Sequence, residues 1–354
     1  MTLTETKKTF TELGKFLSQF KFEANKPVEG VLHNDLFYNN LIDLIALSQS
    51  HNRWFTKEQV HHAIIEWANA LTPENLDNWL QNYSFDVAEP KTVAIIMAGN
   101  IPLVGFHDFL SVLISGHKAL VKLSSNDKFL LPFLSKYLMA INPAMAERIE
   151  FTEEKLENFE AVIATGSNNT ARYFEFYFKN KPSIIRKSRN SVAVLTGNET
   201  HEELVALGED IFRYFGLGCR NVSKIFVPEG YDFKNFFEAI FTYGDIIHYE
   251  KYANNYDYNK AVFLMSNFKL LDNEFITLKE DKSYASPISS LFYEYYNNLN
   301  ELQQRLEADN EQIQCVVGGS DIDNSVPFGR TQKPGLSDYA DNIDTLAFLS
   351  KLKA

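Results

Sequence analysis

The run Lys91-Thr-Val-Ala-Ile-Ile-Met-Ala98 is apolar and rich in β-branched residues, and Gly99-Asn-Ile-Pro102 follows it directly. A short uninterrupted apolar run is typical of a strand that is buried on both faces of a parallel sheet. The Gly and Pro residues after it predict a tight loop. Apolar residues at helical spacing over 106–113 predict a helix next, and Gly116 predicts where that helix ends.

The same alternation continues along the chain. Ala119-Leu-Val-Lys-Leu123 predicts a second strand, Ser124-Ser-Asn-Asp127 the start of another helix, and Phe159-Glu-Ala-Val-Ile-Ala-Thr165 a third strand. Strands that alternate with helices form a parallel sheet with right-handed crossovers. Such sheets hold nucleotides at the carboxyl ends of their strands, so we expect a nucleotide site there.

Both flanks of this region extend the prediction. Residues 1–85 have apolar side chains at helical spacing and predict helices, whereas the second half alternates again. We expect helices over 202–215 and 233–241, and strands over 191–196, 224–227, 261–265, 288–293 and 313–318. The predicted fold class is α/β, with an N-terminal helical region followed by two α/β domains with mostly parallel sheets. We expect domains over 1–190 and 191–330, and a tail over 331–354 that packs back or contacts an oligomer partner.

The composition argues against several classes of function. The 354 residues carry a formal net charge of −12, which disfavours a nucleic-acid binder held by phosphate contacts. Two cysteines far apart, Cys219 and Cys315, favour a reducing compartment over a disulfide framework, and Cys315 is interpreted as a core strand residue. The sequence has no signal-peptide pattern and no apolar run long enough to cross a membrane. We expect a cytoplasmic protein with no membrane insertion.

Cys219 lies in Phe215-Gly-Leu-Gly-Cys-Arg-Asn-Val-Ser223 and has the local signature of a reactive thiol. Gly216 and Gly218 remove side chains just before it, so another group can approach the sulfur. Arg220 places a cation beside it, which favours the nucleophilic thiolate. The predicted helix before it and strand after it put the thiol on a turn. On local sequence alone, a packed structural cysteine and a catalytic nucleophile remain equal alternatives.

Other polar residues favour structural interpretations. His61 and His62 are adjacent, so on a helix their side chains point about 100° apart, and we expect no metal site. Arg186, Lys187 and Arg189 form a basic cluster in an acidic protein. A solvated surface is the default interpretation of this cluster, and attraction of cofactor or coenzyme A phosphates is the alternative.

A series of short segments then carries a family likeness. In order, they are Gly99-Asn-Ile-Pro-Leu103, Gly116-His-Lys-Ala-Leu-Val-Lys-Leu-Ser124, Ala164-Thr-Gly-Ser167, Arg189-Asn-Ser-Val192, Gly218-Cys219, Tyr284-Ala-Ser-Pro-Ile288 and Val326-Pro-Phe-Gly329. Their order and spacing resemble the aldehyde dehydrogenase superfamily. The resemblance is closest to its acyl-CoA reductase branch, the LuxC-like fatty-acid reductases of bacterial luminescence, and it extends from about residue 90 to the C-terminus.

The resemblance implies an aldehyde-dehydrogenase-like fold and a reaction. The reaction would be NAD(P)H-dependent reduction of an acyl thioester to an aldehyde through an acyl-Cys219 intermediate. Asn100 and the backbone N–H of Cys219 would stabilise the tetrahedral oxyanion. The domain over 1–190 would bind the nicotinamide cofactor and the domain over 191–330 would be catalytic. The residues implied at the cofactor are Lys122, Ser124, Thr165, Gly166 and Ser167.

Departures from the family pattern refine the expectation. Residues 184–188, Ile-Ile-Arg-Lys-Ser, have no carboxylate where hydrolytic aldehyde dehydrogenases carry a glutamate base, which favours thioester reduction over aldehyde oxidation. The family's ribose-binding glutamate is also absent, with Ser283 near its place, and Ala171 replaces the last glycine of the dinucleotide loop. The charge of Lys122 favours NADPH over NADH as the cofactor.

The resemblance also implies partners and leaves alternatives. The substrate would be acyl-CoA or an acyl-carrier protein, and the luminescence system suggests a partner enzyme that delivers the acyl group. A homo-oligomer is the default expectation for a soluble enzyme. One alternative is an acyltransferase or thioesterase that uses the acyl-cysteine step without hydride transfer. Another is a non-catalytic partner subunit in which Cys219 is structural.

Overall fold

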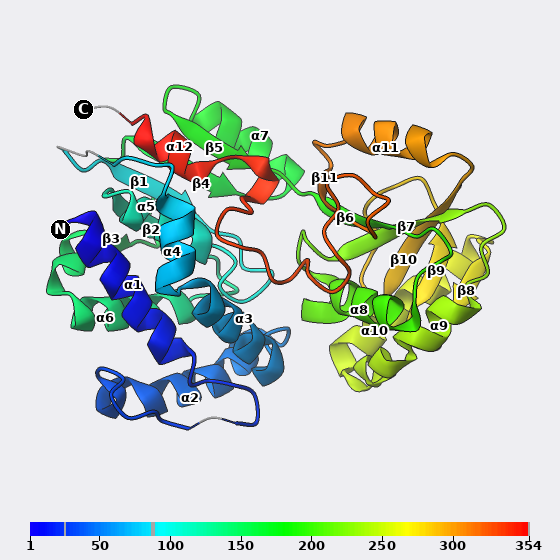
Figure 1. The fold of residues 1–354 in the computed structure, drawn as a ribbon, viewed down its shortest axis with the longest axis horizontal. Coiled ribbons are helices and arrows are strands. Elements are labelled where there is room, and N and C mark those ends of the chain that lie inside the picture. The colour runs from blue at the N-terminus through cyan, green and yellow to red at the C-terminus, as the bar shows by residue number, and fades with distance from the viewer. Residues whose placement is uncertain (25, 86–88, 353–354) are drawn as a thin grey trace. The chain divides into compact units, whose positions relative to one another are not determined.

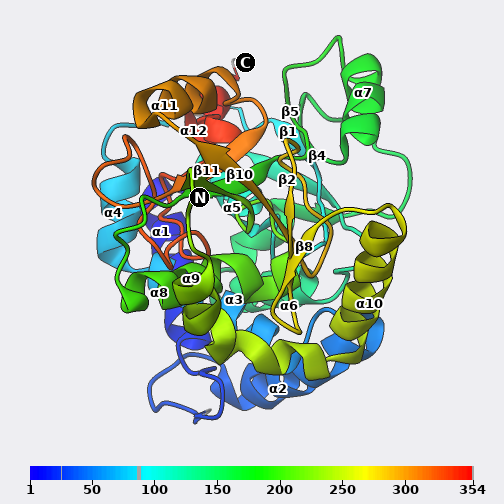
Figure 2. The same cartoon turned by 90° about the vertical axis from the view of Figure 1, so that its right-hand side faces the viewer.

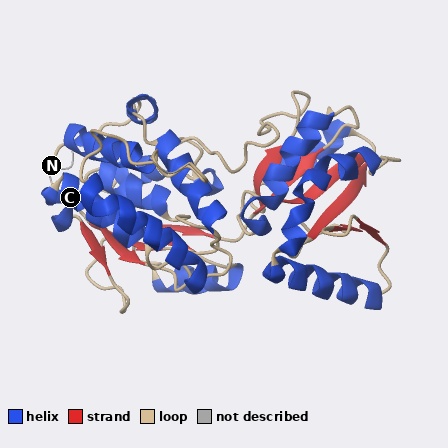
Figure 3. Ribbon diagram, turned by 90° about the horizontal axis from the view of Figure 1, so that it is seen from below, coloured by secondary structure: helices blue, strands red, loops and turns tan. Residues whose placement is uncertain are grey.

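The computed structural model describes residues 1–24, 26–85 and 89–352. The chain divides into two compact units, one formed by Met1–Lys187 with Gly335–Ala354 and the other by Ser188–Pro334 (Figure 1). Each unit has its own sheet with helices packed on it, as the colouring by secondary structure shows (Figure 3). The prediction of an N-terminal helical region and two α/β parts with mostly parallel sheets is confirmed.

The first unit begins with a series of helices, most of which are capped by threonine at their starts; the helix over 34–51 instead follows His33, whose side chain makes no cap. They are α1 (Leu3–Leu17), α2 (Asn34–His51), α3 (Lys57–Ala70) and α4 (Pro73–Leu80). The Thr2, Thr56 and Thr72 side chains each accept a backbone N–H three residues on, which satisfies a donor that the helix leaves unpaired. The apolar stripe of α1 is buried, including Phe10, Leu13 and Phe16. These helices therefore pack through the faces that their sequences mark as apolar.

A five-stranded parallel sheet follows in the same unit. Its elements are β1 (Thr92–Ile96), α5 (Phe106–Ile114), β2 (Lys118–Lys122), α6 (Leu130–Ile141), β3 (Ile149–Phe151), β4 (Ala161–Thr165), α7 (Asn168–Tyr177) and β5 (Ser183–Arg186), with strand order β3-β2-β1-β4-β5. Val93 and Ile95 of β1 belong to the core that the N-terminal helices, α5 and α6 complete. Ala94 faces the other way, into a smaller cluster with Phe174 of α7. The central strand is thus covered on both faces, as its sequence predicts.

The C-terminal segment completes this unit, and its last helix is α12 (Thr345–Ser350). The His107 ring hydrogen-bonds through Nε2 to the carbonyl oxygen of Leu336 at 2.8 Å. Trp79 Nε1 donates to the hydroxyl of Tyr339 at 2.9 Å, and both residues are buried. Residues separated by more than 200 positions in the sequence therefore share one core.

The second unit has a six-stranded sheet in the order β11-β6-β7-β10-β9-β8, whose strands are labelled in Figure 1. Figure 2 shows β11, β10 and β8 of this sheet in a turned view. Only β8 runs antiparallel to its neighbour among the described pairings. The elements are β6 (Asn190–Val194), α8 (His201–Phe212), β7 (Val222–Pro228), α9 (Lys234–Ile240), α10 (Glu250–Met265), β8 (Leu270–Asp272), β9 (Thr277–Glu280), β10 (Ser290–Tyr296), α11 (Leu299–Ala308) and β11 (Ile313–Val317). Helices α8 and α9 pack on one face, and Leu302 and Leu306 of α11 pack on the other.

One predicted strand is wrong. Residues 261–265, Ala-Val-Phe-Leu-Met, form the last part of helix α10 and not a strand. A five-residue apolar run fits a buried strand and a helical segment equally well by pattern alone. The run is also not core, because Val262, Leu264 and Met265 are exposed. In the described ranges, no helix combines the length and the apolar composition needed to cross a membrane.

Candidate active site

Cys219 is exposed and lies on the turn between the end of helix α8 and the start of strand β7, as predicted. A short 3-10 helix, η2 (Arg213–Gly216), leads from α8 into this turn. The N–H of Asn221 donates to the carbonyl of Gly218 at 3.0 Å, so Cys219 and Arg220 are the two central residues of a β-turn. A sulfur at the tip of a turn is accessible to a reagent or a substrate.

The backbone just before this turn is left-handed at three consecutive residues. Tyr214, Phe215 and Gly216 have φ values of 53°, 58° and 76°. Only Gly216 adopts such a conformation without steric cost, and each aromatic residue pays roughly 1 kcal/mol or more. Both aromatic side chains are buried, and the Phe215 ring stacks on Tyr249 with centroids 4.8 Å apart. Aromatic packing therefore holds the chain in a conformation that local propensity disfavours.

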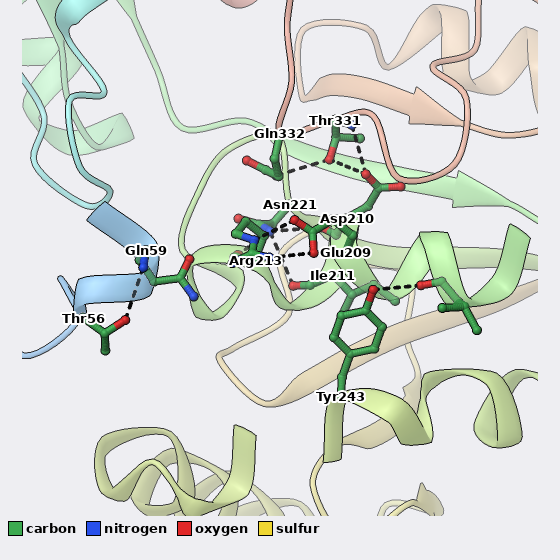
Figure 4. A network of polar contacts seen from close by, with 11 residues as sticks. Thr56, Gln59, Glu209, Asp210, Ile211, Arg213, Asn221, Tyr243, Thr331 and Gln332 are labelled. Carbon is green, nitrogen blue, oxygen red and sulfur yellow. Dashed lines mark hydrogen bonds and ion pairs between the residues drawn. The ribbon is translucent and has the colours of Figure 1, made fainter. Parts of the chain in front are cut away.

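The side chain of Asn221 joins the Cys219 turn to the end of helix α8 (Figure 4). Its Oδ1 accepts the N–H of Gly218 at 2.8 Å. Its Nδ2 donates to the carbonyl oxygens of Asp210 at 3.0 Å and Arg213 at 2.8 Å, which lie in the part of the helix where carbonyls lack internal partners. The side chain is buried, so these contacts are shielded from water.

Two further contacts fix the surroundings of the thiol. The Ser191 hydroxyl, on β6, donates to the carbonyl of Cys219 at 3.0 Å. The guanidinium of Arg220 donates to Sγ of Cys315 at 3.3 Å, which gives the buried second cysteine a polar neighbour. The proposed influence of Arg220 on the Cys219 thiolate stays a prediction.

A second network in Figure 4 anchors the segment that follows β11 to the same helix. The carboxylate of Asp210 accepts the N–H of Gly329 at 2.7 Å, and it accepts both the N–H and the hydroxyl of Thr331, at 2.9 and 2.8 Å. Burial raises the pKa of Asp210, although these donors oppose the shift. Helix α8 thus holds both the Cys219 turn and the segment around Gly329.

In the first unit, the predicted cofactor residues gather at the carboxyl edge of the sheet. Ile96, the last residue of β1, pairs with Lys122 of β2 on one side and with Ala164 of β4 on the other. The residues that follow these positions along β1, β2 and β4 therefore leave the sheet at the same edge. They include Asn100, Ser124, Thr165, Gly166 and Ser167.

The loop that carries Asn100 is held by a buried carboxyl group. Asn100 itself is exposed, and three residues later Leu103 is buried with a left-handed φ of 57°. The N–H of Leu103 donates to Oδ2 of Asp127 at 2.9 Å. Burial raises the pKa of Asp127 to about 6, even though the backbone N–H groups of Leu103 and Leu130 lower it.

Gly99 and Gly166 are needed where the loops after β1 and β4 pass close to other groups. A Cβ at Gly99 would lie 2.5 Å from Oγ of Ser124, and a Cβ at Gly166 would lie 3.0 Å from Cβ of Thr170. Ser167 caps the ten-residue helix α7 by accepting the N–H of Thr170 at 3.2 Å. This arrangement puts the N-terminus of α7 directly after β4, where a helix dipole attracts anions.

Three cationic residues of the first unit that the sequence singles out, Lys122, Arg186 and Lys187, make contacts of their own. Lys122 Nζ donates to the carbonyl of Glu154 at 2.8 Å. The default interpretation of the basic cluster as a solvated surface is wrong for Arg186, which is buried and pairs with Asp108 and the hydroxyl of Thr345. Lys187 pairs with Glu175 at the surface at 2.8 Å. Arg186 therefore joins β5, α5 and α12 and is not available to phosphates.

The predicted residues fall into two groups. Asn100 and the five proposed cofactor residues belong to the first unit, whereas Cys219 belongs to the second. Sequence reasoning missed Asn221, Asp210 and Asp127, whose partners are all defined by the fold. A weak signal existed for Asn221, which follows Cys219 by two residues, and for Asp127, which ends the polar stretch 124–127 that predicts a helix start. Among the residues that the structure describes, no group of three or more His, Cys, Asp or Glu could hold a metal ion.

Comparisons with known proteins identify a family and a fold. Residues 13–242 match a family model described as acyl-CoA reductase (LuxC). The fold is similar to aldehyde dehydrogenase 21 of Physcomitrella patens in complex with the reaction product succinate, with a TM-score of 0.68 and 12% identity over 99% of this chain and 84% of that one. It is also similar to a Bacillus cereus aldehyde dehydrogenase in complex with NAD+, with a TM-score of 0.61 and 12% identity over 90% of this chain and 72% of that one. No curated protein sequence matches the chain.

Proposed function

The chain belongs to the acyl-CoA reductase (LuxC) family, and from that premise we propose that it reduces an acyl thioester to an aldehyde through an acyl-Cys219 intermediate. Family and fold together support an aldehyde-related oxidoreductase. The observation that carries the finer proposal is the exposed thiol of Cys219 on the turn before β7, inside the matched region. The acyl-thioester substrate and the steps below are our proposal.

In the proposed reaction, the sulfur of Cys219 attacks the carbonyl carbon of the thioester. A carbon–sulfur bond forms to Cys219, the bond to the carrier sulfur breaks, and the carrier leaves as a thiol after taking up a proton. The amide of Asn100 and the backbone N–H of Cys219 are proposed to donate hydrogen bonds to the oxyanion. The strained residues before the turn support this role, since backbone strain clusters at active sites.

A nicotinamide cofactor is proposed at the carboxyl edge of the first sheet. The residues there fit a phosphate-containing group, because the N-terminus of α7 follows Thr165 and Gly166 directly and Ser167 is exposed. When bound, the reduced cofactor would supply a hydride. The acyl carbon would take up this hydride, its bond to the Cys219 sulfur would break, and the sulfur would take up a proton as the aldehyde leaves. Lys122 adds a positive charge at the end of β2, which favours NADPH, with NADH as the alternative.

The composition of residues 184–188 supports one fate of the acyl group over another. Residues 184–188 contain no carboxylate to activate water, and the one charged side chain of β5, Arg186, is buried in an ion pair. Water is therefore a poor acceptor for the acyl group. This feature supports thioester reduction over aldehyde oxidation.

The carrier and the partners belong to the same proposal. Acyl-CoA and an acyl-carrier protein share the thioester, and both satisfy the chemistry. A cytoplasmic homo-oligomer served by an acyl-delivering enzyme is the setting that the family resemblance suggests.

The proposal is tested by intact mass spectrometry after brief incubation with a series of acyl-CoAs. We expect a mass gain of one acyl group in wild type and in Cys315→Ala, and none in Cys219→Ala. Acylation that proceeds while NADPH and NADH leave the adduct unchanged would support an acyltransferase or thioesterase. Absence of acylation with every acyl-CoA and acyl-carrier protein would make Cys219 structural and support a non-catalytic subunit.

A further inference from the structure

We propose that Asn221 and Ser191 are positioning residues that fix the backbone on either side of Cys219, so that its sulfur is held in the orientation for attack on the acyl carbonyl. This inference rests on the proposed function. It concerns two residues that lie outside the proposed oxyanion and cofactor groups. Ser191 binds the backbone of Cys219 itself, and the Asn221 side chain binds the backbone of Gly218, the residue before it.

The two hydrogen bonds bracket the cysteine. Oδ1 of Asn221 accepts the N–H of Gly218, the residue before Cys219, at 2.8 Å. The hydroxyl of Ser191 donates to the carbonyl of Cys219 itself at 3.0 Å. The peptide after the Cys219 Cα is held by Ser191, and the peptide before it is held through the Gly218 carbonyl, which accepts the backbone N–H of Asn221 at 3.0 Å. Oδ1 of Asn221 holds the next peptide back, so strand β6 and the end of helix α8 together set the direction of the Cα–Cβ bond.

The supports are rigid because both are buried. Ser191 is fully buried on β6, which pairs with a strand on each side, and Asn221 has 3% of its surface exposed. The same Asn221 side chain donates to the carbonyls of Asp210 and Arg213, so it cannot move without breaking contacts to α8. The turn is thus fixed to two separate secondary-structure elements, strand β6 and helix α8.

The turn needs such supports, because two residues before it adopt a backbone conformation that is unfavourable for their type. Tyr214 and Phe215 are left-handed without being glycine, and relaxation of either residue would move the segment that leads into Gly218 and Cys219. A nucleophile displaced by about 1 Å can lose roughly 100-fold in rate while the substrate still binds. Positioning therefore predicts a loss of rate and not a loss of affinity.

The experiment compares Asn221→Ala, Ser191→Ala and a matched control, Ser223→Ala. Ser223 also uses its hydroxyl to bind backbone carbonyls, that of Tyr284 at 2.7 Å and, at the longer distance of 3.4 Å, that of Ser191. Among the described hydrogen bonds its side chain makes none to residues 218–221, and the Ser191 hydroxyl that binds Cys219 is left in place. For each variant, the acylation rate of Cys219 is measured by intact mass over a range of acyl-CoA concentrations. Alkylation by iodoacetamide serves as a second readout that needs an accessible sulfur but no bound carbonyl.

The expected result is a split between rate and affinity. The maximal acylation rate should fall roughly 10- to 100-fold in Asn221→Ala and roughly 3- to 10-fold in Ser191→Ala, with half-saturation within about twofold of wild type. Alkylation should change less than acylation in both variants, and Ser223→Ala should match wild type in every readout. If Asn221→Ala fails to fold, Ser191→Ala decides the question.

Two contrary results have different meanings. If wild type is acylated and the folded variants acylate at its rate, or if acylation and alkylation fall together, the positioning role is wrong and the proposed function stands. If wild type is acylated by no acyl thioester, the proposed function fails and the positioning role fails with it.

Discussion

The turn that carries Cys219 and the loop that carries Asn100 both contain a strained backbone residue, and each is held in place by a buried side chain of a different chemical type. Each contains a buried left-handed residue that is not glycine, Phe215 in one and Leu103 in the other. Each is also tied to its unit by a buried polar side chain that accepts a backbone N–H, Asn221 in one and Asp127 in the other. The first anchor is a neutral amide, whereas the second is a carboxyl group whose pKa burial raises to about 6.

This difference separates the two loops in their response to pH. A neutral amide does not titrate, so the hydrogen bonds by which Asn221 holds the Cys219 turn do not depend on pH. The Asp127 carboxylate is costly to bury, and in the folded protein its charge state changes around pH 6. The comparison therefore predicts a pH-independent support for the proposed nucleophile and a pH-dependent support for the proposed oxyanion donor.

The largest effect, on the rate of acylation, should come from substitution of Asn100 itself. Asn100→Ala removes a proposed donor to the oxyanion, and loss of one such donor costs about 100- to 1,000-fold in rate. Because Asn100 is exposed, the variant should keep wild-type thermal stability. Single-turnover acylation of Cys219 by acyl-CoA is the measurement, and Cys315→Ala is the control. An acylation rate within about threefold of wild type would remove Asn100 from the mechanism.

Removal of the two anchoring side chains, Asn221 and Asp127, should lower the free energy of unfolding by different amounts. Asn221→Ala breaks contacts to Gly218, Asp210 and Arg213 and leaves buried groups unpaired, so we expect a loss of about 2–4 kcal/mol in the free energy of unfolding. Asp127→Ala at pH 8 also breaks a contact, but it removes a buried charge, so its loss should be smaller. Urea denaturation of both variants at pH 8 checks the order. The reverse order would show that the amide is the weaker support.

The smallest effect is a pH dependence with a defined sign. The folded pKa of Asp127 is about 6 and its ordinary value is 3.8, so the folded state binds the extra proton in between. The stability from protonated Asp127 is fully present below pH 3.8 and is lost as pH rises to about 6. Asp127→Asn, which carries no charge, should remove this contribution, roughly 2–3 kcal/mol across the window.

The measurement for this prediction is the free energy of unfolding at pH 4.5 and pH 7.5 in wild type and Asp127→Asn. Wild type should lose more stability than the variant between the two values. The variant Asn221→Asp serves as a contrast, since it introduces a titratable group into the other loop. Parallel pH profiles of wild type and Asp127→Asn would mean that Asp127 keeps an ordinary pKa.

Local sequence was sufficient for the parts of the fold and site that depend on local chemistry. The strand before Gly99 and the turn around Cys219 were both predicted, because apolar runs and glycines act over a few residues. The left-handed conformation of Phe215 could not be predicted, since the ring that packs against it, Tyr249, lies 34 residues away. The ion pair of Arg186 with Asp108 spans 78 residues and was misread as a solvated surface for the same reason.

Short elements are a second case that sequence periodicity does not predict. Strands β3 and β5 have three and four residues and were not predicted, because too few positions exist to show a periodicity. The run 261–265 has strand-like composition and is helical because it continues α10. In both cases the neighbours in the fold, and not the residues themselves, determine the structure.

The central claim is that the acyl group on Cys219 leaves as an aldehyde. The most direct measurement acylates the protein with acyl-CoA, removes the free thioester by gel filtration, adds NADPH, and quantifies aldehyde against acyl-Cys219. Our account predicts one aldehyde formed and one NADPH oxidised for each acyl group lost, and none of either in Cys219→Ala. An acyl group that persists with NADPH and NADH, or that appears as free acid, would contradict it.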